Sequence, residues 1–305
     1  MASDHADAIA TSAAGDILDL LGHHAPDDDA SAASNAAMYE GVAAADIYRN
    51  FLDWLFATFH ENEELFRARC LSEMGAVSGK RVLIIGCGLG EDVAVTRDLV
   101  GPDGVVHAQD LSRTCVELTA KANPASNVFC SVSDAQALPY RDGVFDAVYH
   151  TGGINLFGDI PGALSEMARV CKLGGVIVFG DESIAPHLRQ TEYGRMFLSN
   201  NPLWGADLPL QHLPVGARDI RVSYVLGNCF YLIRFTNADG PPSVDIDVPH
   251  LGYRGGSVRS RHFGVVEGID VDLKRALYDR AQQENTSVSA VLAGLVRGYL
   301  GPDPD

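Results

Sequence analysis

Three glycines follow a short apolar run at intervals that suit close contact with a nucleotide. In the stretch VLIIGCGLGED, Gly86, Gly88 and Gly90 occupy alternate positions after the run 81–85. Glycine allows tight turns and close approach of the backbone to a ligand, and a helix that begins behind the loop offers unpaired N–H groups. A dinucleotide loop, G-x-G-x-x-G, requires glycine where Glu91 stands. A carboxylate there opposes a pyrophosphate but tolerates a neutral or cationic ligand.

Titratable side chains stand at the ends of two later apolar runs. His150 ends the run FDAVYH and is the candidate for a general base or for a group that orients a substrate, because histidine titrates near neutral pH. A hydrogen-bonded histidine that only shapes the pocket is an equally good interpretation. Asp181 and Glu182 end the run VIVFGDE, where one of them orients a substrate or caps a helix.

Strand and helix patterns alternate along the chain and must position these residues. The alternation predicts a doubly wound, mostly parallel α/β sheet, in which ligands bind beyond the carboxyl ends of the strands. A final pair of strands separated by Gly-Asn-Cys predicts an antiparallel hairpin that closes a seven-stranded sheet. The expected strands are 81–85, 105–109, 128–131, 145–150, 176–180, 220–226 and 230–236, and the expected helices between them include 112–122 and 160–170.

The glycine loop resembles the G-x-G-x-G motif of class I S-adenosylmethionine-dependent methyltransferases. The segments VVHAQDLS and SVSDAQALPYRDGVFDAV agree with that family at the expected places. FDAVYHTGGINLFGD and ALSEMARVCKLGGVIVFGDE resemble its ubiquinone/menaquinone-biosynthesis-like branch. The similarity extends over residues 38–236. It implies a Rossmann-like fold, S-adenosyl-L-methionine as the cofactor and S-adenosyl-L-homocysteine as the product.

The resemblance also implies which residues hold the cofactor. Asp110 is expected to accept hydrogen bonds from both ribose hydroxyls, Asp134 to hold the exocyclic amine of adenine, and Ala135 to lie along the ring. No metal site is expected, because the six cysteines have no zinc-type spacing. The expected cofactor-binding residues are Gly86, Cys87, Gly88, Gly90, Asp110, Leu111, Ser133, Asp134, Ala135 and Thr151.

The resemblance implies methyl transfer to a small organic acceptor, in secondary or quinone-like metabolism, with the target atom left open. The loop after the fourth strand lacks the Asn/Asp-Pro-Pro-Tyr signature of enzymes that methylate amino groups of DNA or protein glutamine. A methyltransferase acting on a peptide or protein is an alternative. The residues expected to line the acceptor pocket are Tyr39, Tyr48, Asn155, Trp204 and His212.

The charge of the chain is unevenly distributed. The 305 residues carry a formal net charge of −17, and nine carboxylates precede the first basic residue, Arg49. We therefore expect a disordered acidic leader over 1–37, a methyltransferase domain over 38–238 that begins with lid helices at 38–72, and a linker over 239–252. The acidic balance argues against a nucleic-acid partner. The absence of long apolar runs argues against a membrane span, and the expected location is the cytoplasm.

The segment 253–305 resembles a ribbon-helix-helix module. It has a strand-like stretch near 259–269, a helical stretch over 271–284 and a second one that ends at Leu300. Such modules pair across a two-fold axis, so the resemblance implies a homodimer. From 250 to 300 there are seven basic residues and five carboxylates. This balance favours a dimerisation or docking element, and a cofactor-sensing DNA-binding regulator is the alternative.

Overall fold

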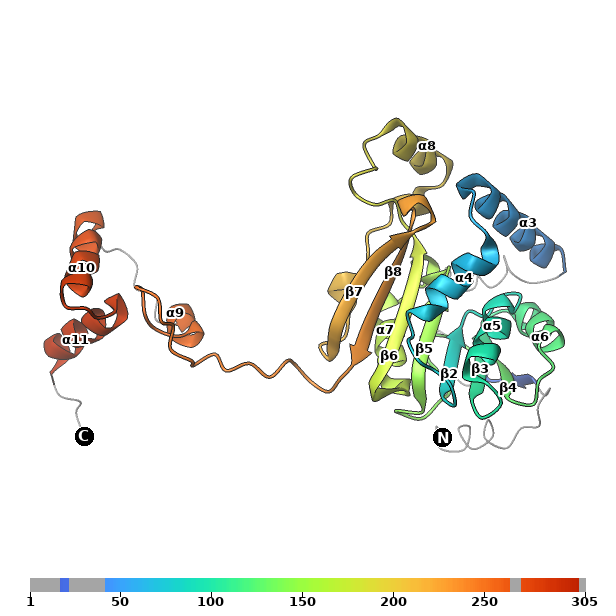
Figure 1. Cartoon of the computed structure of the whole chain (residues 1–305), viewed down its shortest axis with the longest axis horizontal. Helices are drawn as coiled ribbons and strands as arrows, with labels where there is room; N and C mark the ends of the chain where they lie inside the picture. The colour runs from blue at the N-terminus through green and yellow to red at the C-terminus, as the bar shows by residue number, and fades with distance from the viewer. Residues whose placement is uncertain (1–16, 22–41, 264–269, 302–305) are drawn as a thin grey trace. The chain divides into compact units, whose positions relative to one another are not determined.

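The computed structural model of the chain describes residues 17–21, 42–263 and 270–301. The chain divides into two compact units, Met1–Pro241 and Pro242–Asp305. The first unit is built on one eight-stranded sheet (Figure 1). Its strands are β1 (Ile17–Asp19), β2 (Arg81–Ile85), β3 (Val105–Asp110), β4 (Val128–Val132), β5 (Phe145–Thr151), β6 (Cys171–Glu182), β7 (Ala217–Val225) and β8 (Phe230–Asn237).

The strand order is β1-β4-β3-β2-β5-β6-β8-β7. The strands from β1 to β6 pair in parallel, whereas β8 pairs antiparallel with both β6 and β7. The predicted doubly wound sheet with a closing hairpin is therefore confirmed. From β2 the chain builds the sheet outward first through β3 and β4 on one side and then through β5 and β6 on the other. Ligands bind at such switch points in open α/β sheets.

Both faces of the sheet are covered, which explains why the central strand β2 is apolar from Val82 to Ile85. In β2, Val82 and Ile84 belong to the core on one face, and Leu83 and Ile85 belong to the core on the other. All four side chains are at most 1% exposed. A parallel strand buried on both faces has no position for a polar side chain, so its sequence loses the polar–apolar alternation.

Within the described residues of the first unit, six α-helices lie around the sheet (Figure 1). Buried side chains of α3, α4, α5 and α6 pack into one core, and those of α7 pack into the other. Side chains at Asn62, Ser112, Asp159 and Thr191 cap four of the helices by accepting a backbone N–H from the first turn. The six are α3 (Val42–Phe59), α4 (Glu63–Ser72), α5 (Glu91–Val100), α6 (Arg113–Ala122), α7 (Ile160–Val170) and α8 (Glu192–Asn200).

The leader contributes a strand that the sequence did not predict. Residues 17–19 form β1, which pairs in parallel with 130–132 of β4. The sheet therefore has eight strands instead of seven, and a wholly disordered leader is wrong for these residues. The strand lies in the short apolar run ILDLL, and Ile17, Leu18, Leu20 and Leu21 pack against the two cores although the rest of the leader is rich in Ala and Asp. The rest of the leader, 1–16 and 22–37, lies outside the described residues.

The second unit contains α9 (Val258–Phe263), α10 (Val271–Gln283) and α11 (Val288–Leu300). The two long helices agree with the sequence prediction, but the predicted strand is wrong at 259–263, which belongs to α9. Ser257 and Ser260 explain the helix there: each side chain accepts the backbone N–H of the other, at 3.2 and 2.7 Å, as in a capping box. The rest of the predicted strand, 264–269, lies outside the described residues.

Over the described parts of the chain, no helix has the length and apolar character needed to cross a membrane.

Candidate functional site

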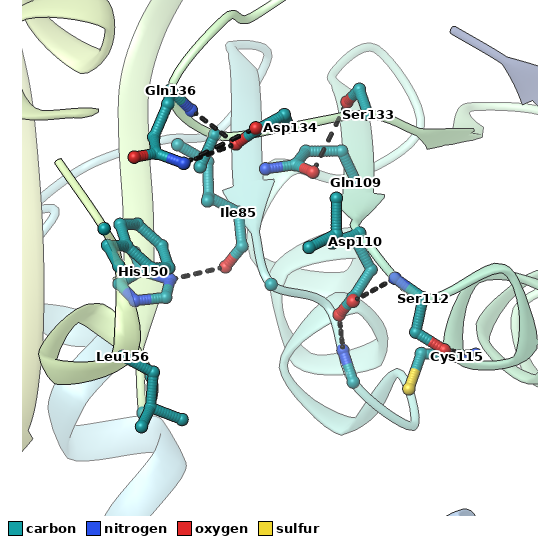
Figure 2. Close-up of a pocket in the computed structure, with 18 of the residues that line it drawn as sticks. Ile85, Gln109, Asp110, Ser112, Cys115, Ser133, Asp134, Gln136, His150 and Leu156 are labelled. Carbon is teal, nitrogen blue, oxygen red and sulfur yellow. Dashed lines mark hydrogen bonds between the residues drawn. The ribbon is translucent and has the colours of Figure 1, made fainter. Parts of the chain in front are cut away.

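Two adjoining cavities lie at the carboxyl ends of the central strands. The first has a volume of about 900 Å³ and lies over the ends of β2, β3, β4 and β5 (Figure 2). The second lies between the ends of β5 and β6 and the helices α3 and α4. Four residues line both cavities, namely Tyr48, Gly152, Gly153 and Leu156. The two cavities therefore adjoin at these four residues.

The glycine loop and Asp110 form one wall of the first cavity. Gly86 and Gly88 have positive φ angles of 64° and 52°, in the left-handed region that favours glycine. The carboxylate of Asp110 accepts the backbone N–H of Gly88 at 3.0 Å and that of Ser112 at 2.9 Å. Figure 2 shows these bonds holding the carboxylate at the mouth of the loop. Each carboxylate oxygen has further lone pairs, so Asp110 can also accept hydrogen bonds from a ligand.

The opposite wall comes from the loop after β4. The carboxylate of Asp134 accepts the backbone N–H of Gln136 at 2.9 Å, and the hydroxyl of Ser133 donates to Gln109 Oε1 at 3.3 Å. These contacts fix Asp134 and Ser133 (Figure 2), and the neighbouring Ala135 also lines the cavity. Leu111 lines the cavity between the two walls.

Three of the residues expected to bind the cofactor do not line the first cavity. Cys87 is buried beneath the loop, and burial raises the pKa of its thiol well above the usual range. Gly90 packs on α6, where a Cβ atom would lie 2.7 Å from Asn123 Nδ2. Thr151 lines the second cavity, and its hydroxyl donates to Asp92 at 3.2 Å. Cys87 and Gly90 therefore shape the loop from behind.

His150 lies in the first cavity with one ring nitrogen engaged. Its Nδ1 lies 2.9 Å from the carbonyl oxygen of Ile85 (Figure 2). A carbonyl only accepts, so Nδ1 carries the proton and Nε2 is the basic nitrogen. Nε2 is buried and has no hydrogen-bond partner among the described residues. Burial lowers the pKa of His150, although the contact with Ile85 and the charges of Asp181 and Asp92 oppose this change. The imidazole is thus neutral at neutral pH.

The second cavity has apolar walls and a polar end. Tyr48 and Asn155, both expected in the acceptor pocket, line it. The Asn155 side chain donates to the backbone carbonyl of Glu182 at 2.8 Å. Asp181 and Glu182 of β6 lie at the polar end, together with Arg67. The apolar lining residues are Ile47, Phe51, Leu52, Leu55, Phe56, Phe66, Leu156, Leu203 and Phe230.

The structure does not bring the remaining expected pocket residues to either cavity. Trp204 is 1% exposed and packs in the core, with its ring 5.3 Å from that of Phe197 and 6.0 Å from that of Phe59. His212 is exposed in a short 3₁₀ helix (Leu210–His212) and lines neither cavity. Both expectations are therefore corrected. Trp204 belongs to the core, because a large apolar ring gains more from the core than from a cavity wall. Tyr39 lies outside the described residues.

An ion-pair network ties the helices over the second cavity to the glycine-loop helix. Arg49 of α3 lies 2.6 Å from Glu63 of α4 and 2.9 Å from Glu91 of α5. Arg67 of α4 lies 2.8 Å from Glu63 and 3.0 Å from Asp92. Burial acts to lower the pKa of Arg67, but the surrounding carboxylates raise it above its usual range. Glu91, whose charge made a dinucleotide ligand unfavourable in the sequence analysis, thus helps to hold α3 through its ion pair with Arg49.

Residues 83–179 match the family model described as a methyltransferase domain. These residues form a methyltransferase domain. The match contains β3 to β5 and most of β2 and β6, and it confirms the resemblance on which S-adenosylmethionine was expected as the cofactor.

Demethylmenaquinone methyltransferases of Staphylococcus aureus strains JH9 and Newman are 34% identical to the chain over 119 residues. The matched part is 39% of this chain and 49% of the relatives, so the chain spans about half the length of these curated proteins.

Solved methyltransferases resemble the structure at low sequence identity. An S-adenosylmethionine-dependent methyltransferase from Aquifex aeolicus is 20% identical, with a TM-score of 0.42, over 56% of this chain and 89% of that one. A phosphoethanolamine N-methyltransferase from Haemonchus contortus, solved with S-adenosyl-L-methionine, is 15% identical, with a TM-score of 0.48, over 61% of this chain and 56% of that one.

Several residues that line the two cavities were not predicted from the sequence. Gln109, Ser112 and Gln136 line the first cavity, and each lies within two residues of a predicted acidic ligand. Their closeness to Asp110 and Asp134 was the available signal. Arg67 had no such signal, because only the packing of α4 brings it to the second cavity.

Proposed function

We propose that the chain is an S-adenosylmethionine-dependent methyltransferase that methylates a small, largely apolar organic acceptor. The observation that carries the proposal is the border shared by the two cavities at Tyr48, Gly152, Gly153 and Leu156. Methyl transfer is an in-line displacement, so donor and acceptor must meet end to end at such a border.

The first cavity fits the methyl donor. A Cβ atom at Gly86 would make a tight contact of 3.3 Å with the ring of His150, and both Gly86 and Gly88 have positive φ angles that favour glycine, so the loop presents bare backbone to a ligand. We expect Asp110 to accept hydrogen bonds from the ribose hydroxyls and Asp134 to accept one from the adenine amine. S-adenosylmethionine supplies a methyl group that is already activated on a sulfonium. The protein therefore has to position the acceptor and exclude water.

The second cavity supports an aromatic, quinol-like acceptor. Phe51, Phe56 and Phe230 line it, and stacking and edge contacts with such rings favour a flat apolar ligand. The name demethylmenaquinone methyltransferase, carried by relatives that match part of the chain, points to the same kind of ligand.

We propose that His150 takes up the proton when the methyl acceptor must lose one. Its neutral imidazole has Nδ1 engaged by Ile85, and this contact orients Nε2 as the basic nitrogen. His150 lies in the first cavity beside Gly153, one of the shared border residues. We expect Nε2 to take a proton released at the border or to hold the acceptor atom there.

The proposal is tested by following label from methyl-tritiated S-adenosylmethionine. The full chain is incubated with 1,4-dihydroxynaphthalene as a quinol probe, and organic-soluble and polypeptide fractions are counted. Label in the organic fraction that depends on the probe supports the proposal. Label that enters only polypeptide in a cell extract would favour the peptide alternative, and no transfer to either fraction contradicts methyltransferase activity.

We further propose that the second unit joins two copies of the chain. Its helices α10 and α11 expose large apolar side chains, of which Leu273, Leu295 and Tyr299 are 62%, 58% and 91% exposed. Exposed apolar groups of this size are typical of association surfaces. Truncation after Pro249 is expected to convert a dimer to a monomer in sedimentation velocity, and an unchanged association state contradicts this. The cytoplasmic location stays a prediction.

A further inference from the structure

Gln109, near the end of β3, is a buried amide that lines the first cavity. The residue is 1% exposed and lies between the glycine loop and the loop after β4. In the sheet it pairs with Ile85 of β2 on one side and with Ser131 of β4 on the other. Its backbone carbonyl accepts the N–H of Cys87 at 2.9 Å. The backbone of Gln109 is therefore held firmly at the switch point of the sheet.

One end of the Gln109 amide is engaged by the protein and the other end is not. Oε1 accepts the hydroxyl of Ser133 at 3.3 Å, so Nε2 points away from Ser133 and into the space between the two walls (Figure 2). Within the part of the chain that the structure describes, no group accepts a hydrogen bond from Nε2. When a ligand fills the cavity and displaces water, an N–H donor without an acceptor costs free energy. A ligand that fits this cavity should therefore supply an acceptor.

The base of the methyl donor carries acceptors of this kind. Gln109 precedes Asp110, which we expect at the ribose, and lies beside the loop of Asp134, which we expect at the exocyclic amine. The part of the nucleoside between these two groups is the purine ring. The ring nitrogens N1, N3 and N7 of adenine carry a lone pair and no hydrogen, so they accept hydrogen bonds and do not donate them. The N–H end of an amide therefore matches the ring, whereas the oxygen end has no hydrogen to offer.

We infer that Gln109 recognises the adenine ring by donating a hydrogen bond from Nε2 to one of its ring nitrogens. The hydroxyl of Ser133 keeps the donor end of the amide turned toward the ligand. This inference rests on the proposed function, because it takes the first cavity as the cofactor site. It adds a side chain that makes cofactor binding depend on a nitrogen atom of the base.

The test is a binding experiment that needs no turnover. The full chain is titrated calorimetrically with S-adenosylhomocysteine and with its 1-deaza, 3-deaza and 7-deaza analogues. In each analogue one ring nitrogen is replaced by C–H, which cannot accept the amide hydrogen. We expect one of the three to bind about tenfold or more weakly than S-adenosylhomocysteine. That analogue identifies the nitrogen that Gln109 contacts.

Gln109→Met then tests the residue. Methionine has a similar length and no N–H group, so the hydrogen bond is lost with little change in packing. We expect the variant to bind S-adenosylhomocysteine about tenfold more weakly, and to bind the identified analogue within about threefold of S-adenosylhomocysteine. Gln190→Met, at an exposed glutamine that lines neither cavity, is the matched control and should keep the original difference.

Two outcomes would overturn the inference. One is equal affinity of the unaltered protein for S-adenosylhomocysteine and all three analogues. The other is a Gln109→Met protein in which every difference seen with the unaltered protein persists. The comparison of ligands on the unaltered protein remains a test if the variant does not fold. Failure of the unaltered protein to bind S-adenosylhomocysteine would instead contradict the proposed function.

Discussion

The two cavities are built from different parts of the fold. The first is walled mainly by loops at the ends of β2 to β5, where backbone N–H groups fix the carboxylates of Asp110 and Asp134. The second is walled mainly by side chains of α3 and α4, which the ion pairs of Arg49 and Arg67 hold in place. A ligand site made by strand ends is fixed by the sheet, whereas one made by packed helices depends on how those helices are attached. We therefore expect that substitutions can weaken ligand binding in one cavity without weakening it in the other.

The largest effect is expected for Asp110→Ala. The change removes a charged acceptor for two ribose hydroxyls, and each such bond contributes about 1.5–3 kcal/mol. The affinity for S-adenosylhomocysteine should fall by about 150-fold or more, measured by titration calorimetry. Asp98→Ala, an exposed carboxylate on α5, is the control and should bind normally. An Asp110→Ala protein with an affinity within about threefold of the original would falsify the ribose assignment.

Arg49→Ala should affect the other cavity. The change releases α3 from Glu63 and Glu91 and leaves both carboxylates without that partner. We expect the affinity for the quinol probe 1,4-dihydroxynaphthalene to fall by about tenfold, with the affinity for S-adenosylhomocysteine reduced by less than about threefold. Arg97→Ala, whose guanidinium pairs with Asp98 on the surface, is the control. Equal losses of affinity for both ligands would mean that Arg49 supports both cavities and that the contrast between them is wrong.

The strands that form the first cavity should also make the stability of the protein sensitive to acid, through a buried histidine. His107 of β3 packs against Phe129, Tyr140 and Phe145, and burial, with the charge of Arg81, lowers its pKa to about 3. Unfolding restores a pKa of about 6.5. The unfolded state then binds more protons between these values, so stability is fully present above about pH 6.5 and is lost as the pH falls toward 3.

Denaturant unfolding measures this effect. Between pH 6.5 and 5.5 the free energy of unfolding should fall by about 1 kcal/mol because of His107. His107→Phe, which keeps an aromatic ring, should reduce the pH dependence by that amount. A variant with the same pH dependence as the original protein would show that His107 is not the group that titrates.

The smallest effect is expected for deletion of residues 1–21. Removing β1 takes away three strand pairs on the edge of β4 and the exposed ion pair between Asp19 and Arg113. We expect the free energy of unfolding to fall by less than about 1 kcal/mol, and the cofactor affinity to stay unchanged. Loss of cofactor binding on deletion would mean that the edge strand helps to form the first cavity.

The same contrast explains how far the sequence could predict the molecule. Gly86, Gly88, Asp110 and Asp134 were predictable because each follows a recognisable apolar strand, and parallel strands end at one edge of a sheet. Trp204 was misplaced because its position depends on packing against Phe59 and Phe197, which are far apart in the sequence.

Two short elements, β1 and α9, could not be predicted from the sequence for a related reason. β1 has three residues, and its pairing depends on backbone hydrogen bonds that composition does not reveal. α9 is a six-residue helix with β-branched and aromatic residues at its ends, so its pattern resembled a strand. Reciprocal capping by Ser257 and Ser260 decides the conformation there.

The central claim is that the first cavity binds S-adenosylmethionine and its product instead of a dinucleotide. The most direct measurement is calorimetric titration of the unaltered full chain with S-adenosylhomocysteine and, separately, with NAD⁺. The account predicts one bound S-adenosylhomocysteine per chain and no measurable binding of NAD⁺. Binding of NAD⁺ in the absence of S-adenosylhomocysteine binding would contradict it.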